Sequence, residues 1–183
     1  MKKLALTFVV ALIAFACKNE AKHSEIQETI NSKLIETSPE LIVSIDFKTN
    51  KVDEFRLLLN NIKVDEFQKK NIQIIEKVSP SSSTDNIIAK FGENNISKLF
   101  LIVLGTKELK EVIIENIRLS YGKNNINIKP SELEKYFNFN KFIEFDSASN
   151  KILTKKVEGK HNPVLQLKPF ALKKLEESSD ISK

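Results

Sequence analysis

The stretch LIVSIDFK, residues 41–48, decides the fold class of this chain. Leu41, Val43, Ile45 and Phe47 occupy every second position within it. Successive side chains of a β-strand point to opposite faces, so this spacing places all four apolar side chains on one face and the polar ones on the other. The stretch therefore predicts a half-buried strand with one face in a hydrophobic core.

Similar apolar runs follow along the chain, at residues 55–59, 71–78, 86–91, 98–105, 112–121, 126–129, 141–145 and 151–158. Paired asparagines at 60–61, 94–95 and 124–125 predict turns, because asparagine tolerates the left-handed backbone of tight turns, and SPSSSTD at 79–85 predicts a loop. No long amphipathic helix separates the runs. They indicate an antiparallel β-sandwich or barrel, with SELEKYF at 131–137 as a small helical turn inserted late in the sheet.

Residues 1–16, MKKLALTFVVALIAFA, have the layout of a secretory signal peptide. Two lysines precede an apolar run that extends from Leu4 to Phe15. This run is shorter than the roughly 20 residues that a transmembrane helix needs, and it has the length of a signal sequence. We therefore expect the protein to be exported to the cell envelope.

Cys17 is the only cysteine of the chain. In an exported protein it cannot form an internal disulfide, and a free exposed thiol is a liability. The preceding Ala14-Phe15-Ala16 resembles a bacterial lipobox, although the usual motif has leucine in place of Ala14 and a small residue in place of Phe15. We expect Cys17 to carry lipid and to anchor the protein to a bacterial membrane, the outer membrane in our interpretation. An ordinary cleavage site followed by an incidental cysteine is the alternative.

Four segments make up the expected domain organisation. The signal peptide is followed by a lipidated N-terminus and tether at 17–39, in which capping-box spacing predicts a short helix from about residue 24 to 34. The β-sandwich domain occupies residues 40–168. The tail at 169–183 is expected to be a frayed helix or disordered.

Charge and motifs argue against several function classes. The net charge is +5, and removal of the leader lysines leaves +3 (27 basic minus 24 acidic residues). Only Arg56 and Arg118 are arginines, so the lysines are more typical of a solvated surface than of nucleic-acid recognition. The two histidines, His23 and His161, and the scattered glycines match no metal or phosphate-binding motif. We expect no catalytic residues, no cofactor and no metal.

Two pairs of adjacent carboxylates, Asp53-Glu54 and Asp65-Glu66, are the acidic candidates for chemistry. Adjacent side chains on a strand point to opposite faces, and both pairs occur in turn-like segments where solvation is the ordinary explanation. A glycan hydrolase, which would need two carboxylates about 5–10 Å apart, is kept as a remote alternative.

Carbohydrate sites commonly present aromatic rings that stack on sugars, and the aromatic-rich segment here is KYFNFNKFIEF, residues 135–145. Alternation places Phe137 and Phe139 on one side and Asn138 and Asn140 on the other, so burial of the phenylalanines in the core is the simpler interpretation. The chain has no tryptophan and two tyrosines. Residue type alone selects five candidate ligand contacts: Arg118, Tyr121, Tyr136, Asn138 and Asn140.

Six motifs in order carry a family resemblance: Phe47-Lys48-Thr49, Asp53-Glu54-Phe55, Leu104-Gly105, 113–122, 136–146 and 159–163. Their order resembles a jelly-roll, galactose-binding-like β-sandwich (carbohydrate-binding-module-like) of exported or membrane-anchored bacterial proteins linked to glycan handling. Val103 replaces a common aspartate, and His161-Asn162 replaces Tyr-Asp. The resemblance implies an all-β, antiparallel, jelly-roll-like sandwich that acts as a non-catalytic binding module.

Two functions are weighed on this basis. The first is a membrane-anchored lipoprotein that binds carbohydrate, and the alternative is a structural or assembly lipoprotein that binds an envelope protein through a sheet face or edge. The exposure of two tyrosine side chains distinguishes the two functions. Tyr121 and Tyr136 together on a concave outer face, with asparagines, would favour a glycan, whereas burial of both would favour a protein partner.

Overall fold

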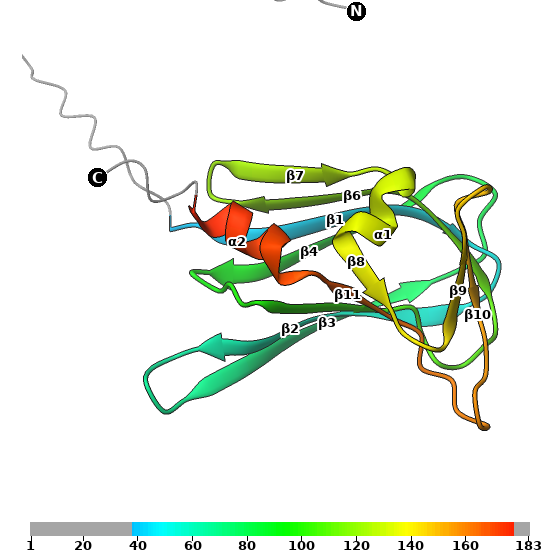
Figure 1. Ribbon diagram of the computed structural model, residues 1–183, viewed down its shortest axis with the longest axis horizontal. Coiled ribbons are helices and arrows are strands. Elements are labelled where there is room, and N and C mark those ends of the chain that lie inside the picture. Colours follow the sequence, from blue (N-terminus) through cyan, green and yellow to red (C-terminus); the bar gives the residue numbers. More distant parts are fainter. Residues whose placement is uncertain (1–37, 178–183) are drawn as a thin grey trace, which may run out of the picture. The chain divides into compact units, whose positions relative to one another are not determined.

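The computed structural model describes residues 38–177, which form an antiparallel β-sandwich (Figure 1). The signal peptide, Cys17 and the expected tether helix lie outside these residues. One sheet has six strands in the order β4-β1-β6-β10-β9, with β7 also paired to β6. Its strands are β1 (Glu40–Thr49), β4 (Asp85–Glu93), β6 (Glu111–Tyr121), β7 (Asn124–Ile128), β9 (Ile143–Asp146) and β10 (Lys151–Thr154).

The second sheet has five strands in the order β3-β2-β5-β11-β8. Its strands are β2 (Asp53–Lys63), β3 (Lys69–Val78), β5 (Leu99–Val103), β8 (Phe137–Phe139) and β11 (Val164–Leu167). The pairs β2–β3, β6–β7 and β9–β10 are hairpins within a sheet, and the other connections cross between sheets, as in a jelly roll. The predicted fold class is confirmed.

The alternation in residues 41–48 produces the core as expected. Its apolar side chains on β1 are at most 1% exposed and face the equally buried alternate residues of β2 in the other sheet. Phe47 and Phe55 meet there with ring centroids 5.1 Å apart. Burying a phenylalanine side chain stabilises a fold by about 1.5–3 kcal/mol, so this layer is a large part of what holds the sheets together.

Several local details differ from the sequence predictions. Asn60-Asn61 is not a turn between strands but a β-bulge within β2, where Asn61 has a φ of 59° and the pairing with β3 shifts. The chain reverses later, at residues 64–68. The strands β8 and β11 were not predicted, because three or four residues are too few to show a clear alternation.

The helical predictions are met by short elements. The 3₁₀-helix η1 (Pro130–Glu132) continues into α1 (Leu133–Tyr136), where the small helical turn was expected. The tail begins with α2 (Pro169–Glu177). This helix is not frayed, because Ala171, Leu172 and Leu175 are buried in the core cluster.

The sandwich has two distinct ends. At one end β1 begins, β2 and β3 extend as a projecting hairpin, and α2 lies nearby (Figure 1); we call this the hairpin end. The opposite end carries the connections 50–52, 79–84, 104–110 and 155–163, and we call it the loop end. Loops at the ends of β-sandwiches commonly carry function, so the loop end is the first place to look for a site.

Candidate functional site

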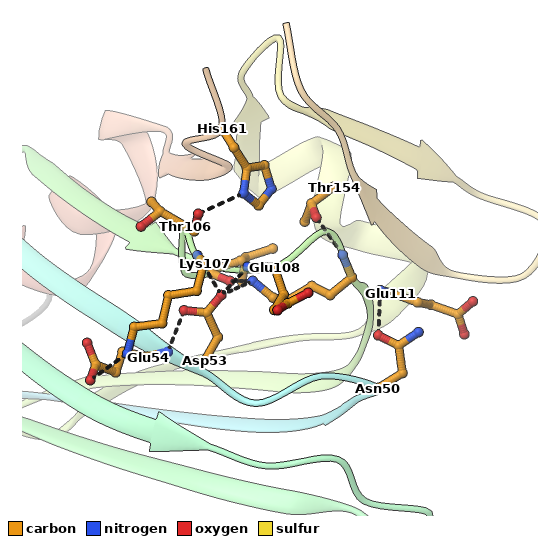
Figure 2. Close-up of polar contacts among 11 residues, drawn as sticks. Asn50, Asp53, Glu54, Thr106, Lys107, Glu108, Glu111, Thr154 and His161 are labelled. Carbon is orange, nitrogen blue, oxygen red and sulfur yellow. Dashed lines mark hydrogen bonds and ion pairs between the residues drawn. The ribbon is translucent and has the colours of Figure 1, made fainter. Parts of the chain in front are cut away.

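A buried carboxylate lies at the centre of the loop end. Asp53, the first residue of β2, is 2% exposed and accepts hydrogen bonds from the backbone N–H groups of Glu54 (2.7 Å), Lys107 (3.1 Å) and Glu108 (3.3 Å), drawn in Figure 2. The ammonium group of Lys110 donates to it as well and forms an ion pair. This location is a correction, because Asp53 was expected to be solvated in a turn.

Lys110 is as deeply buried as its partner. It is 4% exposed, and its Nζ also donates to the carbonyl of Leu104 at 2.9 Å. Its backbone exchanges hydrogen bonds with Thr154, from Lys110 N to Thr154 Oγ1 and from Thr154 N to Lys110 O, both 2.9 Å. A buried charge is tolerated only when it is paired and hydrogen-bonded, and both charges meet this condition.

The electrostatics of the pair keep Asp53 ionised. Burial by itself raises the pKa of Asp53, but the hydrogen bond from Lys110, the backbone hydrogen bonds and the charge of Lys110 together outweigh burial and lower it. Both carboxylate oxygens already accept hydrogen bonds from the protein. The arrangement therefore positions the loop 104–110 and leaves little capacity for acid–base chemistry.

Gly105 allows the loop to approach Asp53 this closely. It has a φ of +83°, and a Cβ at this position would lie 2.2 Å from Asp53 Cγ. Only glycine adopts this backbone readily and leaves room for the carboxylate. The Asp53-Glu54-Phe55 and Leu104-Gly105 motifs are thus two parts of one contact.

His161 joins a third segment to the same loop. Its Nδ1–H donates to the carbonyl of Thr106 at 3.2 Å, and its Nε2 is buried (Figure 2). The histidine thus links the connection 155–163 to the connection 104–110. This contact agrees with a structural role for His161.

Beside this network lies a small, open hollow of about 140 Å³. Most of its lining residues carry hydroxyl, amide or charged side chains, and one is aliphatic. They are Lys48, Thr49, Asn50, Ser81, Ser82, Glu111 and Ile113. The Thr49 residue is 4% exposed, and its hydroxyl has no hydrogen-bond partner among the described residues. Two hydrogen bonds shape the rim: the Asn50 side-chain Oδ1 accepts from Glu111 N at 2.9 Å, and the Thr49 carbonyl accepts from Ser81 N at 3.2 Å.

The five residues selected by type do not converge. Arg118 and Tyr121 lie on β6, three positions apart, so Arg118 is exposed and Tyr121 is only 7% exposed on the core side. Tyr136, at the end of α1, is 8% exposed and packs on Phe170 with ring centroids 5.5 Å apart. Neither tyrosine offers an open ring face for stacking.

The two asparagines belong to the other sheet. Asn138 is an exposed residue of β8, and Asn140 follows that strand. Asn140 Oδ1 accepts hydrogen bonds from the N–H groups of Phe142 and Val164, both 3.2 Å, and its Nδ2 donates to Asn162 O at 2.7 Å. The Asn140 side chain therefore links the β8–β9 connection to the start of β11 by hydrogen bonds. Cys17, the expected lipidation site, lies outside the described residues.

Within residues 38–177, no group of three or more His, Cys, Asp or Glu side chains is placed to hold a metal ion. In the same part of the chain, no helix has both the length and the apolar character needed to cross a bilayer. Comparisons with protein-family models, with curated proteins and with solved structures found no match for this chain.

Proposed function

We propose that this protein is an exported, lipid-anchored lipoprotein whose β-sandwich is a non-catalytic module that binds a protein partner. The observation that carries the choice of partner is the burial of Tyr121 and Tyr136. A sugar stacks on an exposed ring face, and these rings are covered by the protein itself. Their burial supports a protein partner over a glycan platform built on these residues.

The surface best suited to a partner is the outer edge of β3. This strand is the edge of the five-stranded sheet and pairs with β2, while no other described strand pairs with it. Its middle, residues 71–75, carries no charge, and Ile75 is 52% exposed. An uncharged edge of this length offers unpaired backbone groups to which an extended partner segment can add as a strand.

A photo-crosslinking residue in place of Gln73 tests this edge in the native envelope. We expect one discrete protein adduct, which disappears when Ile75→Lys is added, because a lysine there opposes strand addition. The matched control places the probe at Ile88, which is 60% exposed on β4, the edge strand of the other sheet. No adduct at position 73, or equal adducts at both positions, would contradict the proposed edge.

The lipid anchor has its own test. Cells grown with radiolabelled fatty acid should yield labelled protein in the membrane fraction, and Cys17→Ser should abolish the label. Retention of label by Cys17→Ser, or an unlabelled wild-type protein, would refute lipidation of Cys17 and favour ordinary cleavage.

A second candidate function is carbohydrate binding, and the hollow at the loop end, most of whose lining residues are polar, favours it. Hydroxyl, amide and carboxylate groups suit sugar hydroxyls, and Thr49, whose hydroxyl has no hydrogen-bond partner among the described residues, is one of the lining residues. The test is salt-resistant binding to an immobilised polysaccharide panel. Binding that Thr49→Val abolishes and that Thr106→Val, at an exposed residue outside the hollow, preserves would rank this function first.

A further inference from the structure

The tip of the β2–β3 hairpin, residues 63–70, exposes apolar side chains far beyond what a solvated turn needs. Phe67 is 94% exposed, the largest value among the exposed hydrophobic side chains of residues 38–177, and Val64 is 54% exposed. The strand β2 pairs with β5 only as far as Asn60, so the hairpin continues past the sandwich and carries these side chains outward (Figure 1).

The turn is built to hold Phe67 in this position. Asp65 Oδ1 accepts hydrogen bonds from the N–H groups of Phe67 (2.8 Å) and Gln68 (2.7 Å). The Gln68 carbonyl accepts from Val64 N at 3.0 Å. A turn closed by these bonds has a defined shape, so the aromatic ring projects on an ordered support.

Basic side chains surround the apolar tip. Lys63, Lys69 and Lys70 are all exposed, and no ion pair involving them occurs among the described residues. The acidic residues of the tip are Asp65, whose carboxylate accepts from the turn amides, and Glu66. The tip therefore combines an exposed aromatic ring with a surplus of one positive charge (three lysines minus two acids).

The hairpin tip and the start of the described chain lie at the same end of the sandwich. Pro39 O accepts from Asn94 N at 2.7 Å, and a few residues later Ser97 Oγ donates to Asn60 O beside the base of the hairpin. The segment 94–97 thus bridges Pro39 and the hairpin. The sequence from Pro39 back to Cys17 spans 22 positions (39 minus 17), and a chain can cover at most about 3.6 Å per residue.

We propose that the hairpin tip is a membrane contact, in which Phe67 and Val64 enter the interface of an anionic bilayer and Lys63, Lys69 and Lys70 meet its headgroups. Aromatic side chains partition into the interface, and each lysine near an anionic surface adds attraction. The choice of bilayer rests on the lipid anchor of the proposed function. The contact would turn the loop end away from the membrane.

Tryptophan fluorescence tests the contact without background, because the chain contains no tryptophan. The full chain carrying Phe67→Trp, isolated from its own membrane, is reconstituted on vesicles of phosphatidylcholine and phosphatidylglycerol. We expect a blue-shifted emission that lipids with brominated acyl chains quench. Ile88→Trp, on the exposed face of β4 away from the tip, should remain unquenched.

Vesicle partitioning gives the size of the effect. In the Cys17→Ser chain, Phe67→Ala should weaken binding to anionic vesicles about tenfold, and each lysine-to-glutamine change at the tip should weaken it about fivefold. Substituting Ile88→Ala, at an exposed apolar side chain on β4, should leave partitioning unchanged.

The outcomes separate this proposal from the lipid anchor. If the chain that keeps Cys17 proves to carry no lipid and its Phe67→Trp emission is still quenched, the membrane contact is supported and lipidation is refuted. A lipid-anchored Phe67→Trp chain whose emission stays unshifted and unquenched would overturn the contact while leaving the anchor in place. A photo-crosslink from position 67 to a protein, without quenching by lipid, would also overturn it and assign the tip to a protein groove.

Discussion

The same five residues, KVDEF, occur at 51–55 and again at 63–67, and the two copies have opposite environments. Phe55 is 1% exposed in the core, whereas Phe67 is 94% exposed. The first copy enters β2 where β1 of the other sheet covers it, and the second forms the turn of a hairpin beyond the reach of β5. Identical local chemistry therefore gives a core residue in one place and a surface residue in the other.

The aspartates of the two copies differ in the same way. Asp53 accepts from the loop 104–110 and pairs with Lys110, more than fifty positions away in sequence. Asp65 accepts from the amides of its own turn. The first carboxylate joins distant segments of the fold, and the second shapes only a local reversal.

Truncating the two phenylalanines should separate the copies most strongly. Phe55→Ala removes a ring from the layer between the sheets and should lower the free energy of unfolding by about 3–5 kcal/mol, because a cavity adds to the lost burial. Phe67→Ala should leave stability nearly unchanged, since its ring is already in water. Urea denaturation of both variants checks this, and equal losses would contradict the assigned environments.

Removing the aspartates should give the next largest contrast. Asp53→Ala leaves the Lys110 ammonium buried without its partner and should cost about 3–5 kcal/mol of unfolding free energy. Asp65→Ala should disturb only the hairpin turn. Calorimetric melting of both variants measures the difference, and the double variant Asp53→Leu with Lys110→Met should recover part of the loss because it leaves no buried charge.

A glycine pair sharpens the description of the Asp53 contact. Gly105 and Gly159 both have positive φ, 83° and 72°, but an added Cβ clashes with Asp53 only at Gly105 and meets nothing within 4 Å at Gly159. Both changes to alanine carry the backbone penalty of about 1–2 kcal/mol. Gly105→Ala should therefore lower the free energy of unfolding by about 1–3 kcal/mol more than Gly159→Ala does, as measured by denaturant titration. Equal losses would mean that the loop 104–110 moves away from Asp53 without an energetic penalty.

The smallest expected effect is on acid stability. The pKa of Asp53 is lowered from an ordinary value of 3.8, so its contribution to stability is complete above that pH and is lost as the pH falls toward the folded-state pKa. Melting temperatures of the wild type should thus decline below about pH 4. Asp53→Asn should show a shallower decline, and identical slopes would show that this carboxylate does not contribute.

Much of the fold could be predicted, because long alternating runs such as residues 41–48 and 112–121 report their buried face directly. The bulge at Asn61 looked like a turn because asparagine serves both with the same left-handed backbone. The ligand contacts chosen by residue type did not converge, since residue type says nothing about which face a side chain takes. Asp53 was interpreted as a solvated turn residue, because the partners that bury it come from distant segments.

The sequence by itself determined the all-β class, most strand positions and the small helical turn, because side-chain periodicity and turn chemistry are local properties of the chain. Only the tertiary structure decided which KVDEF copy is buried, where the buried ion pair lies and which surfaces remain open. Those properties depend on what packs against a segment, and the packing comes from strands far away in sequence. The two copies of one pentapeptide show the boundary between these levels within a single molecule.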